Sequence, residues 1–431
     1  MKPGRRRVVV TGMDVVTPIG TGLDAFWKAA LHGVSGARRI RHFDADGLPT
    51  QIAAPLDDAA LLEEFRAEAG LDPLEPRGVL VGVHAARAAV QGTHAEQALA
   101  SRRAGVYVGT SGERQDLRHL ASMAYASRAA EGEMTPQGFL REFARRTGAE
   151  RAYRSAPQYL ASRLAATFGI EGPSATVQTA CTSSAQAIGE ASRAIARGTV
   201  DVALAGGADC IVSPIEMQLF CLLGVMSKRN DAPESASRPF DAHRDGFVMG
   251  EGAGFLVLEE AEHARRRGAT VVAELAGYGS FCDAYRITDE APDGRGAIRA
   301  MQAAIASAGL DASDIDYVNA HGTSTPMNDR VETAAIKQVF GRHAARLAVS
   351  STKSMIGHTI SAAGAIELIA AVLAVRDGQV PPTINYEVPD PDCDLNYVPN
   401  VAIGAPLRAA ISNSFGFGGH NDCLLVRRWG A

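Results

Sequence analysis

Short runs of apolar and β-branched residues alternate with longer alanine-rich stretches along the whole chain. Short apolar runs of this kind are typical of buried strands, and the longer stretches are typical of helices. The predicted strands are Arg7–Thr11, Val106–Gly109, Asp201–Ala205, Phe255–Leu258, Val271–Leu275, Ile315–Asn319, Leu347–Ser350 and Cys423–Val426. The predicted helices include Gly78–Leu99, Thr182–Ala196, Gly296–Ala308 and Ser361–Val375. This alternation predicts an α/β protein with largely buried sheets.

The two halves of the chain carry similar segments in the same order. These pairs are Val106–Ser111 with Val318–Ser324, the helix that begins at Cys181 with the helix that begins near His358, and Gly246–Gly250 with Gly416–His420. Glycines cluster where strands end, as tight turns between strand and helix require. The order predicts an internal duplication, with an N-terminal half of residues 1–265 and a C-terminal half of residues 266–431.

Residues 112–155 interrupt this regular alternation. The segment is polar, and five arginines but only two glutamates lie between Arg141 and Arg154. One interpretation is a solvated helix face. The other is a docking patch for an acidic partner, held by complementary charge.

Composition excludes several classes of function. With 43 basic and 48 acidic residues, the net charge of −5 does not suggest a nucleic-acid-binding protein. No apolar run approaches the ~20 residues that a membrane span needs. The basic start Met1–Arg7 precedes Val8–Val10, but Asp14 interrupts the apolar run that a signal peptide would need. We therefore expect a cytoplasmic protein.

One of the six cysteines stands apart from the others. There is no Cys-x-x-Cys pair, so the usual zinc frameworks are not expected, and we predict no metal site. Most of the cysteines are expected to be small buried apolar residues. Cys181, within Val177–Ser184, lies between a β-rich run and a helix. The N-terminal end of a helix lowers the pKa of a thiol, so this cysteine is a candidate nucleophile.

Three further polar motifs also follow predicted strands. They are Val318–Pro326 with His321, Ser351–His358 with Lys353, and the glycine-rich Ser414–Asn421. Each motif alone is compatible with a structural role. Together with Cys181, however, they favour a single active site at the ends of strands.

With these motifs, the chain resembles the β-ketoacyl-acyl-carrier-protein synthases of the elongating Cys–His–His branch. TACTSS, AHGTSTP, STKSMIGH and SNSFGFGGHN occur in the family's order, and the resemblance covers nearly the whole chain. It implies the thiolase-like fold, an α/β architecture of five layers, αβαβα, built from two related halves. It also implies a dimer.

The resemblance assigns the chemistry to five residues. Cys181 resembles the nucleophile that takes the acyl chain from a carrier protein. His321 and His358 resemble the pair that promotes decarboxylation of a malonyl thioester, with neutral imidazoles donating hydrogen bonds to the enolate oxygen. Lys353 resembles the lysine that tunes the histidines, with Glu367 as its matching carboxylate. The implied reaction is decarboxylative Claisen condensation, which elongates a fatty-acid, polyketide or polyene chain.

The resemblance also implies how substrates are held. The N–H groups of Cys181 and Phe417 would form an oxyanion hole, and Phe417 would act as a movable gate. Thr323 and Thr325 match the threonines that hold the pantetheine arm. Arg145 and Arg146 align with carrier-docking positions. No cofactor of its own is expected, because the substrates are carried on the phosphopantetheine arm of an acyl carrier protein.

Some assignments remain open after this comparison of motifs. Asp329 and Glu332 match family positions, where a structural role is an equal alternative. A homodimer is expected, with a heterodimer containing a chain-length-factor-like subunit as the alternative. The alternative function is that of a non-condensing partner subunit that binds carriers, although Cys181 argues against it.

The chain departs from the family pattern at places that concern the substrate. Thr110–Arg114 introduces polar residues where small and apolar ones usually line the acyl pocket. Leu223–Ser227 replaces a familiar Ala-Arg-Ala-Leu-Ser, so a typical docking arginine is missing. The stretch before Gly78 is acidic where it is commonly basic. These departures favour a specialised polyketide or polyene pathway over housekeeping fatty-acid synthesis.

Overall fold

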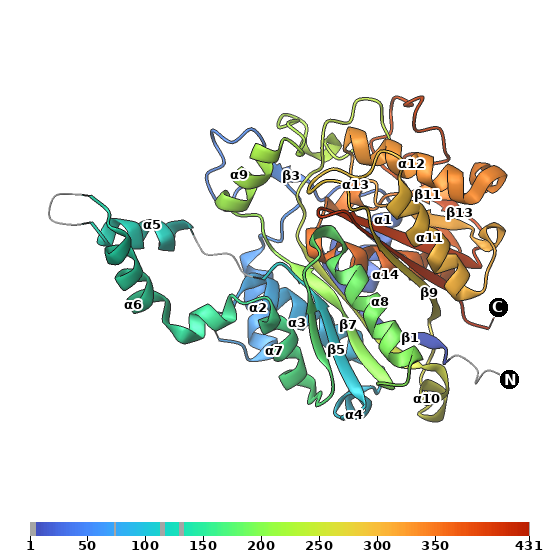
Figure 1. Ribbon diagram of the computed structural model, residues 1–431, viewed down its shortest axis with the longest axis horizontal. Coiled ribbons are helices and arrows are strands. Elements are labelled where there is room, and N and C mark those ends of the chain that lie inside the picture. Colours follow the sequence, from blue (N-terminus) through green and yellow to red (C-terminus); the bar gives the residue numbers. More distant parts are fainter. Residues whose placement is uncertain (1–5, 73–74, 113–116, 129–132, 431) are drawn as a thin grey trace.

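The computed structural model describes residues 6–72, 75–112, 117–128 and 133–430 (Figure 1). One set of strands comes from the first part of the chain: β1 Val8–Thr17, β5 Ala104–Gly109, β6 Ser174–Val177, β7 Val202–Asp209 and β8 Gly252–Glu260. A second set comes from the later part: β9 Ala273–Cys282, β10 Tyr317–Asn319, β11 Ala348–Ser350, β14 Ala409–Gly416 and β15 His420–Arg428. Each predicted strand overlaps one of these.

The two sets of strands have the same order and the same directions. In the first set, β6, β5 and β7 run parallel, and β8 and then β1 follow antiparallel. In the second set, β11, β10 and β14 run parallel, and β15 and then β9 follow antiparallel. β1 and β9 pair at Val9 and Val10, which joins the two sets into one continuous sheet. The repeated order is the structural counterpart of the duplicated sequence motifs.

Helices complete a five-layer arrangement. The central layer holds α8 Ser183–Ala196 and α14 Ala363–Asp377, which contact each other and strands of both sets. α3 Arg77–Val90 and α7 Gln158–Phe168 cover the outer face of the first set, and α11 Arg295–Ala308 and α12 Pro326–Phe340 the outer face of the second. The predicted α/β class and its layered form are therefore confirmed.

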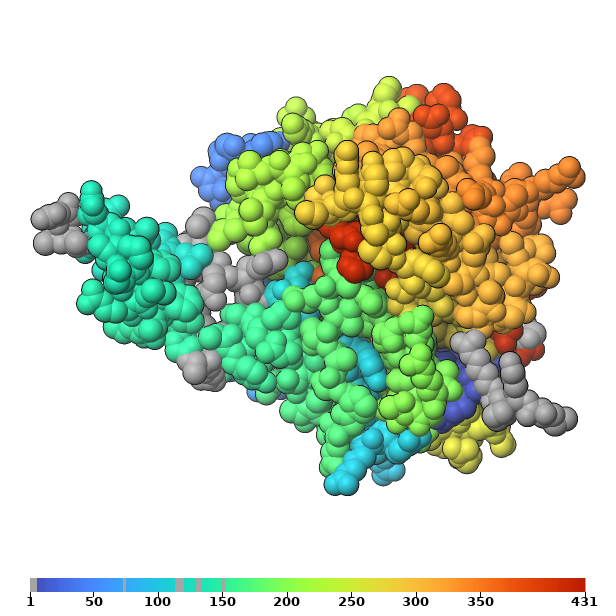
Figure 2. Space-filling view, in the orientation of Figure 1, coloured from blue at the N-terminus to red at the C-terminus, as the bar shows by residue number. Residues whose placement is uncertain are grey.

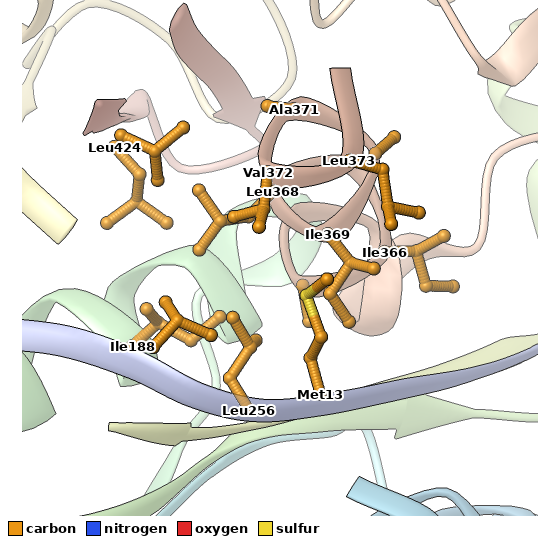
Figure 3. Close-up of a cluster of buried hydrophobic side chains, with 14 of the residues drawn as sticks. Met13, Ile188, Leu256, Ile366, Leu368, Ile369, Ala371, Val372, Leu373 and Leu424 are labelled. Atoms are coloured by element: carbon orange, nitrogen blue, oxygen red, sulfur yellow. The ribbon is translucent and has the colours of Figure 1, made fainter. Parts of the chain in front are cut away.

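The apolar core is centred on α14. Every residue from Ala363 to Val375 is buried, as expected for a helix that is apolar around its whole circumference. Figure 3 shows Leu368 and Ile369 of α14 near Ile188 of α8, with Leu256 and Met13 on the strands beneath. Burying such side chains contributes roughly 1.5–3 kcal/mol each, so this layer accounts for much of the cohesion between the two halves.

Both central helices begin in the same unusual way. A short 3₁₀ turn precedes each one: η1 Ala180–Thr182 before α8, and η5 Ile360–Ala362 before α14. The first residue of each turn has a left-handed backbone, with φ of 51° at Ala180 and 45° at Ile360. Such a conformation costs a non-glycine residue roughly 1–2 kcal/mol, so both turns must be held by their surroundings.

The structure differs from the sequence prediction in three elements. β6 lies in the β-rich run before Cys181, which was not among the predicted strands. The predicted helix Gly78–Leu99 is divided into α3 and a short α4 Glu96–Leu99, because Gly92 adopts a left-handed φ of 74° and the chain turns there. β14 was not predicted as a strand. The sequence of β14 contains Ser and Asn residues typical of turns, yet in the folded protein these residues lie in a strand and are buried.

The segment predicted to be irregular forms an arm. α5 Leu117–Ala126 and α6 Pro136–Arg154 pack against each other and project from the body, at the left of Figure 1. The remaining elements are β2 Gly20–Thr21, β3 Arg38–Arg39, β4 Ile52–Ala53, β12 Gln379–Val380, β13 Ile403–Gly404, α1 Leu23–Leu31, α2 Ala59–Ala69, α9 Pro214–Leu223, α10 Ala261–Arg266, α13 Lys353–Ile356, η2 Pro233–Ser235, η3 Ala312–Asp314 and η4 Gly341–Arg346. Over the described ranges, none of the helices has the length and apolar character to cross a membrane.

Close contact between the central helices requires a glycine. A Cβ at Gly364 would lie 2.6 Å from the Cβ of Ala185 on α8, well inside contact distance. We predict that Gly364→Ala lowers the free energy of unfolding by about 1–3 kcal/mol, the usual cost of overpacking a core. Urea denaturation measures this. Gly404→Ala is the matched control, because the nearest atom there is 4.0 Å away. Equal stability of both variants would contradict the packing described.

Candidate active site

The four strand-end motifs meet at one cavity. It has a volume of about 360 Å³, and its lining includes Cys181, His321, His358 and Phe417. Cys181 follows β6, His321 follows β10, and Phe417 lies in the turn between β14 and β15, while His358 precedes α14. Polar groups at the carboxyl ends of parallel strands are the usual basis of a site in α/β proteins. Red C-terminal atoms are visible at the bottom of this hollow in Figure 2.

The TACTSS motif builds the turn that presents Cys181. The Ser183 hydroxyl donates to the carbonyl of Ala180 (2.6 Å) and accepts from the N–H of Thr179 (3.0 Å). These bonds hold the left-handed Ala180 in place. Ser184 accepts a hydrogen bond from the N–H of Ala365 on α14 (3.0 Å), so the same motif also fixes α8 against α14.

The thiol of Cys181 is neutral in this environment. Burial raises the pKa of Cys181 to about 12. The charge of Lys353 and the N–H groups of Phe417 and Cys181 act in the opposite direction but only partly offset burial. The donors at the helix end lower this pKa as predicted, but removal of the sulfur from water outweighs them, so the expected net lowering is wrong. The two predicted N–H groups do lie near the sulfur.

The hydrogen bonds of the two histidines fix their tautomers. The Lys353 ammonium can only donate, and its Nζ lies 3.3 Å from Nδ1 of His321. The N–H of Ile360 donates to Nδ1 of His358, also at 3.3 Å. A neutral imidazole that accepts at Nδ1 carries its proton on Nε2. His358 Nε2 is buried and has no hydrogen-bond partner among the residues that the structure describes.

Both imidazoles are neutral and face each other. Burial lowers the pKa of His321 and of His358, and the nearby charge of Lys353 lowers both further. The ring centroids are 5.4 Å apart, with the planes at 86°. Each side chain is about 3% exposed, so a substrate oxygen between them would find little competing water. The arrangement can donate two hydrogen bonds to a developing oxyanion.

Lys353 is anchored by an ion pair with Glu367. Both side chains are buried, Lys353 on α13 and Glu367 on α14. Burial raises the pKa of Glu367 to about 7, and the ammonium of Lys353 opposes that rise. The pair places a positive charge beside His321 and close enough to His358 and Cys181 to lower the pKa of each.

Glu332 holds the turn that carries His321. Its carboxylate accepts from the N–H groups of His321 (2.9 Å) and Gly322 (2.8 Å). The amide of Asn413 on β14 donates to the same carboxylate at 3.0 Å. Glu332 is thus a positioning residue, the structural alternative left open by the sequence. Asn413 was missed because β14 was not predicted.

Asp329 also has a structural role. Its carboxylate accepts from the N–H of Phe240 (2.8 Å) and lies 3.3 Å from Nε of Arg244. Both charged side chains are buried. This pair ties α12 to the loop that contains Phe240, and Asp329 itself does not belong to the cavity lining.

Thr323, Thr325 and Phe417 lie along the cavity wall. The two threonine hydroxyls are 2.8 Å apart and both residues line the cavity. Phe417 begins the turn to β15, in which Gly418 and Gly419 have positive φ values of 86° and 75°. The N–H of Gly418 donates to the carbonyl of Ile287 (2.6 Å), which connects this turn to the loop after β9.

Comparisons with known proteins agree with this site. The N-terminal domain of beta-ketoacyl synthases matches residues 5–264, and the C-terminal domain matches residues 272–387. The chain belongs to the beta-ketoacyl synthase family. It is therefore an acyltransferase of the ketosynthase class with the thiolase-like fold.

Relatives of this ketosynthase come from two kinds of pathway. A Streptomyces halstedii protein assigned as polyketide beta-ketoacyl synthase 1 is 44% identical over 98% of both chains. The 3-oxoacyl-[acyl-carrier-protein] synthase 2 of Coxiella burnetii is 40% identical over 98% of this chain and 99% of its own.

Two solved structures resemble this ketosynthase over nearly their whole length. One is a type II polyketide acyl-carrier protein in complex with its ketosynthase bound to the hexaketide (AntDE:AntF), with 32% identity, coverage of 99% of this chain and 100% of that chain, and a TM-score of 0.85. The other is the ishigamide ketosynthase/chain length factor, with 35% identity, the same coverage and a TM-score of 0.85.

The residues expected to dock a carrier lie apart from the cavity. Arg145 and Arg146 are on α6 of the arm, and neither belongs to the cavity lining. Both guanidinium groups bond to the carboxylate of Glu142, at 2.8 Å each. The positive charge of these two surface arginines of the ketosynthase is therefore partly neutralised by Glu142.

The polar segment after β5 is only partly described. Glu113 and Arg114 lie outside the described residues. Ser111 bonds to the carboxylate of Asp209 and to the hydroxyl of Ser361, at 2.8 Å each. Asp209 is buried and close enough to raise the pKa of Cys181, so a polar network lies beside the thiol. In the described part of the chain, no cluster of three or more His, Cys, Asp or Glu residues could hold a metal ion.

The raised pKa of Cys181 has a measurable consequence. Below its pKa, the thiolate fraction rises tenfold with each pH unit, and the thiolate is the reactive form. We predict that alkylation of Cys181 by iodoacetamide accelerates by about tenfold per pH unit between about pH 7 and 9, without a plateau. Peptide mapping measures each site, with the exposed Cys282 as the internal control that reacts faster. A plateau for Cys181 near neutral pH would contradict the burial argument.

Proposed function

We propose that this ketosynthase elongates a carrier-bound acyl chain by decarboxylative Claisen condensation with malonyl-carrier protein, through a thioester on Cys181. The observation that supports it best is the single cavity in which one buried thiol and two neutral imidazoles meet. The relatives named for polyketide and for fatty-acid synthesis support the same class of reaction.

The first half-reaction is acyl transfer. The sulfur of Cys181 attacks the carbonyl carbon of the incoming thioester, and the bond to the pantetheine sulfur breaks. The carbonyl oxygen becomes negative and is stabilised by the N–H groups of Cys181 and Phe417. The thiol proton leaves with the departing pantetheine thiol. The charge of Lys353 stabilises the sulfur as it becomes anionic during this step.

The second half-reaction begins with decarboxylation. The malonyl carbon–carbon bond breaks, carbon dioxide leaves, and the electron pair forms an enolate on the remaining thioester. Nε2 protons of His321 and His358 stabilise the enolate oxygen. The enolate carbon then attacks the acyl thioester of Cys181, which releases the extended β-ketoacyl carrier and leaves a cysteine thiolate that takes up a proton.

The halves of the chain divide this work between them. Residues 1–265 supply Cys181, and residues 266–431 supply both histidines, Lys353 and Phe417. Thr323 and Thr325 hold the pantetheine arm, and Phe417 moves to admit it. The proposed steps use these side chains, the backbone N–H groups of Cys181 and Phe417, and the carrier-bound substrates.

We also infer a dimer and a substrate class. β6 ends the sheet, and no described strand pairs with its outer edge, which a second chain can cover. A homodimer fits best, and the solved ketosynthase/chain length factor pair supports a heterodimer as the second possibility. The Ser111–Asp209–Ser361 network lies close to Cys181, outside the cavity lining, and its polar character supports an oxygenated or unsaturated chain.

The alternative is a partner subunit that binds carriers without condensing them. Such a subunit needs no buried nucleophile. It also needs no pair of histidines whose Nδ1 atoms face Lys353 and the N–H of Ile360, so that each proton is on Nε2. The presence of all of these around one cavity favours the enzyme.

Separate variants should uncouple the two half-reactions. We predict that Cys181→Ala abolishes condensation while release of carbon dioxide from malonyl-carrier protein continues, because the histidines remain. His321→Ala and His358→Ala should instead slow decarboxylation by roughly 10²–10³-fold, the usual loss for an oxyanion donor. Radiolabelled malonyl carrier measures both rates.

Cys221→Ala serves as the matched control, since this cysteine lies outside the cavity lining. Condensation by Cys181→Ala at the wild-type rate would refute the covalent mechanism. Absence of both half-reactions from the wild-type enzyme would instead support the non-condensing partner.

A further inference from the structure

The two strained turns that begin the central helices are held by different groups. In η1, the hydroxyl of Ser183 donates to the carbonyl of Ala180 and accepts from the N–H of Thr179. The corresponding first residue of α14 is Ala363, which has no hydroxyl. The left-handed Ile360 of η5, with φ of 45°, therefore needs support from outside its own turn.

Asp209 supplies this support from the other half of the chain. It is the last residue of β7 and is 1% exposed. Its Oδ2 accepts a hydrogen bond from the N–H of Ser361, the second residue of η5, at 3.1 Å. The hydroxyl of Ser111, which follows β5, donates to the same oxygen at 2.8 Å. One buried carboxylate thus joins the ends of β5 and β7 to the entrance of α14.

The packing of β7 allows the carboxylate to reach this turn. A Cβ at Gly207 would lie 3.1 Å from the carbonyl oxygen of Ser361 and 2.7 Å from the Cβ of Ser184. The glycine therefore permits a close approach of β7 to the starts of both central helices. Hydrogen bonds to a carboxylate are shorter and stronger than those between neutral groups, so the contact with Ser361 can hold a strained backbone.

The turn held by Asp209 directs the proton of His358. The N–H of Ile360, which precedes Ser361, donates to Nδ1 of His358 at 3.3 Å. This bond keeps the proton of the neutral imidazole on Nε2. The backbone of His358 is held separately, by hydrogen bonds with Val248 and Gly250 at 2.7 and 2.8 Å. The support from Asp209 therefore concerns the direction of the Ile360 N–H and not the place of the histidine backbone.

We propose that Asp209 is a positioning residue for His358. Its carboxylate keeps η5 in the conformation in which the N–H of Ile360 meets Nδ1 of the imidazole, so that Nε2 remains a hydrogen-bond donor. This inference rests on the proposed function, because a donor at Nε2 matters where the enolate forms.

Each histidine of the site then has its own buried carboxylate. Glu332 holds the turn that carries His321, through the N–H groups of His321 and Gly322. Glu332 and His321 belong to the same half of the chain. Asp209, in contrast, belongs to the half that contains Cys181 and acts on a histidine of the other half. The contact of Asp209 with η5 therefore couples the nucleophile half to the histidine half.

The charge of Asp209 also affects the thiol. Burial is the largest cause of the raised pKa of Cys181, and Asp209 raises this pKa further, whereas Lys353 lowers it. His321 and His358 line the same cavity but are neutral. Removing the negative charge should therefore increase the thiolate fraction of Cys181 at a given pH. This effect depends on charge and not on the hydrogen bond to η5.

The test uses two substitutions that separate the hydrogen bond from the charge. Asp209→Asn keeps an oxygen acceptor of the same size without the charge, and Asp209→Ala removes both. Asp316→Asn is the matched control, because the carboxylate of Asp316 also accepts from a backbone N–H, that of Arg408 at 2.6 Å, and lies outside the cavity lining. The measurements on the full-length protein are carbon dioxide release from malonyl-carrier protein, acylation of Cys181 by octanoyl-carrier protein, and nitrogen NMR of isotope-labelled histidine.

We expect Asp209→Ala to slow decarboxylation roughly 10–100-fold, the usual range for a misplaced group, while acylation of Cys181 changes far less. Asp209→Asn should recover most of the lost rate, because its amide oxygen can still accept from Ser361. The His358 signals, assigned with His358→Ala, should show a proton on Nε2 in the wild type and in Asp209→Asn, and mixed tautomers in Asp209→Ala.

Alkylation by iodoacetamide gives the charge-dependent readout. Cys181 should react about threefold faster in Asp209→Asn than in the wild type between about pH 7 and 9, since each unit of lowered pKa gives a tenfold gain in thiolate. The exposed Cys282 should react at the same rate in both proteins. Asp316→Asn should behave as wild type in every measurement.

Decarboxylation at the wild-type rate by Asp209→Ala would overturn the proposal, and so would an Asp209→Asn variant as slow as Asp209→Ala. An unchanged tautomer of His358 in Asp209→Ala, or equal losses of decarboxylation and acylation, would also contradict it. If Asp209→Ala does not fold, Asp209→Ser takes its place under the same criteria, because its shorter side chain keeps a polar group in the buried site. A wild-type enzyme that neither releases carbon dioxide nor accepts an acyl group would refute the proposed function itself, which distinguishes the two failures.

Discussion

The contact between α8 and α14 is the constraint on which the site depends. Cys181 stands at the entrance to α8 and His358 at the entrance to α14, so the separation of these helices sets the separation of thiol and imidazole. Gly364 against Ala185, and the hydrogen bond from Ala365 to Ser184, bring the two helix starts together. The polar residues that follow strands of the two related sets, such as Cys181 after β6 and His321 after β10, then meet in one cavity.

Around this contact, burial controls the chemistry more than any single charge. It keeps the thiol of Cys181 and both imidazoles neutral, which suits a reaction that begins and ends with neutral thiols and develops negative charge only transiently. The Lys353–Glu367 pair places one positive charge where that anion forms. Preorganised donors in a water-excluded site need no rearrangement as the charge develops.

The sequence allowed the fold class and the reacting residues to be predicted, because both depend on local patterns. Alternating apolar runs indicate buried strands, and the motifs around Cys181, His321 and His358 stand at strand ends or helix entrances. β14 and Asn413 were not predicted, because the Ser and Asn residues of this segment have the local pattern of a turn. The segment becomes a strand because it pairs with β10 and β15 in the sheet. The pKa of Cys181 was predicted in the wrong direction, because its burial depends on tertiary packing. For the same reason the positioning role of Glu332, which contacts a turn eleven residues away, required the structure.

The central claim is that Cys181 carries the acyl chain in the cavity formed by both halves. Intact-protein mass spectrometry after incubation with a panel of acyl carrier proteins, followed by peptide mapping, tests it most directly. The account predicts a mass increase equal to one acyl group per chain, mapped to Cys181 and absent from Cys181→Ala. A wild-type protein that stays unmodified across the panel, or that is acylated at another residue, would contradict it.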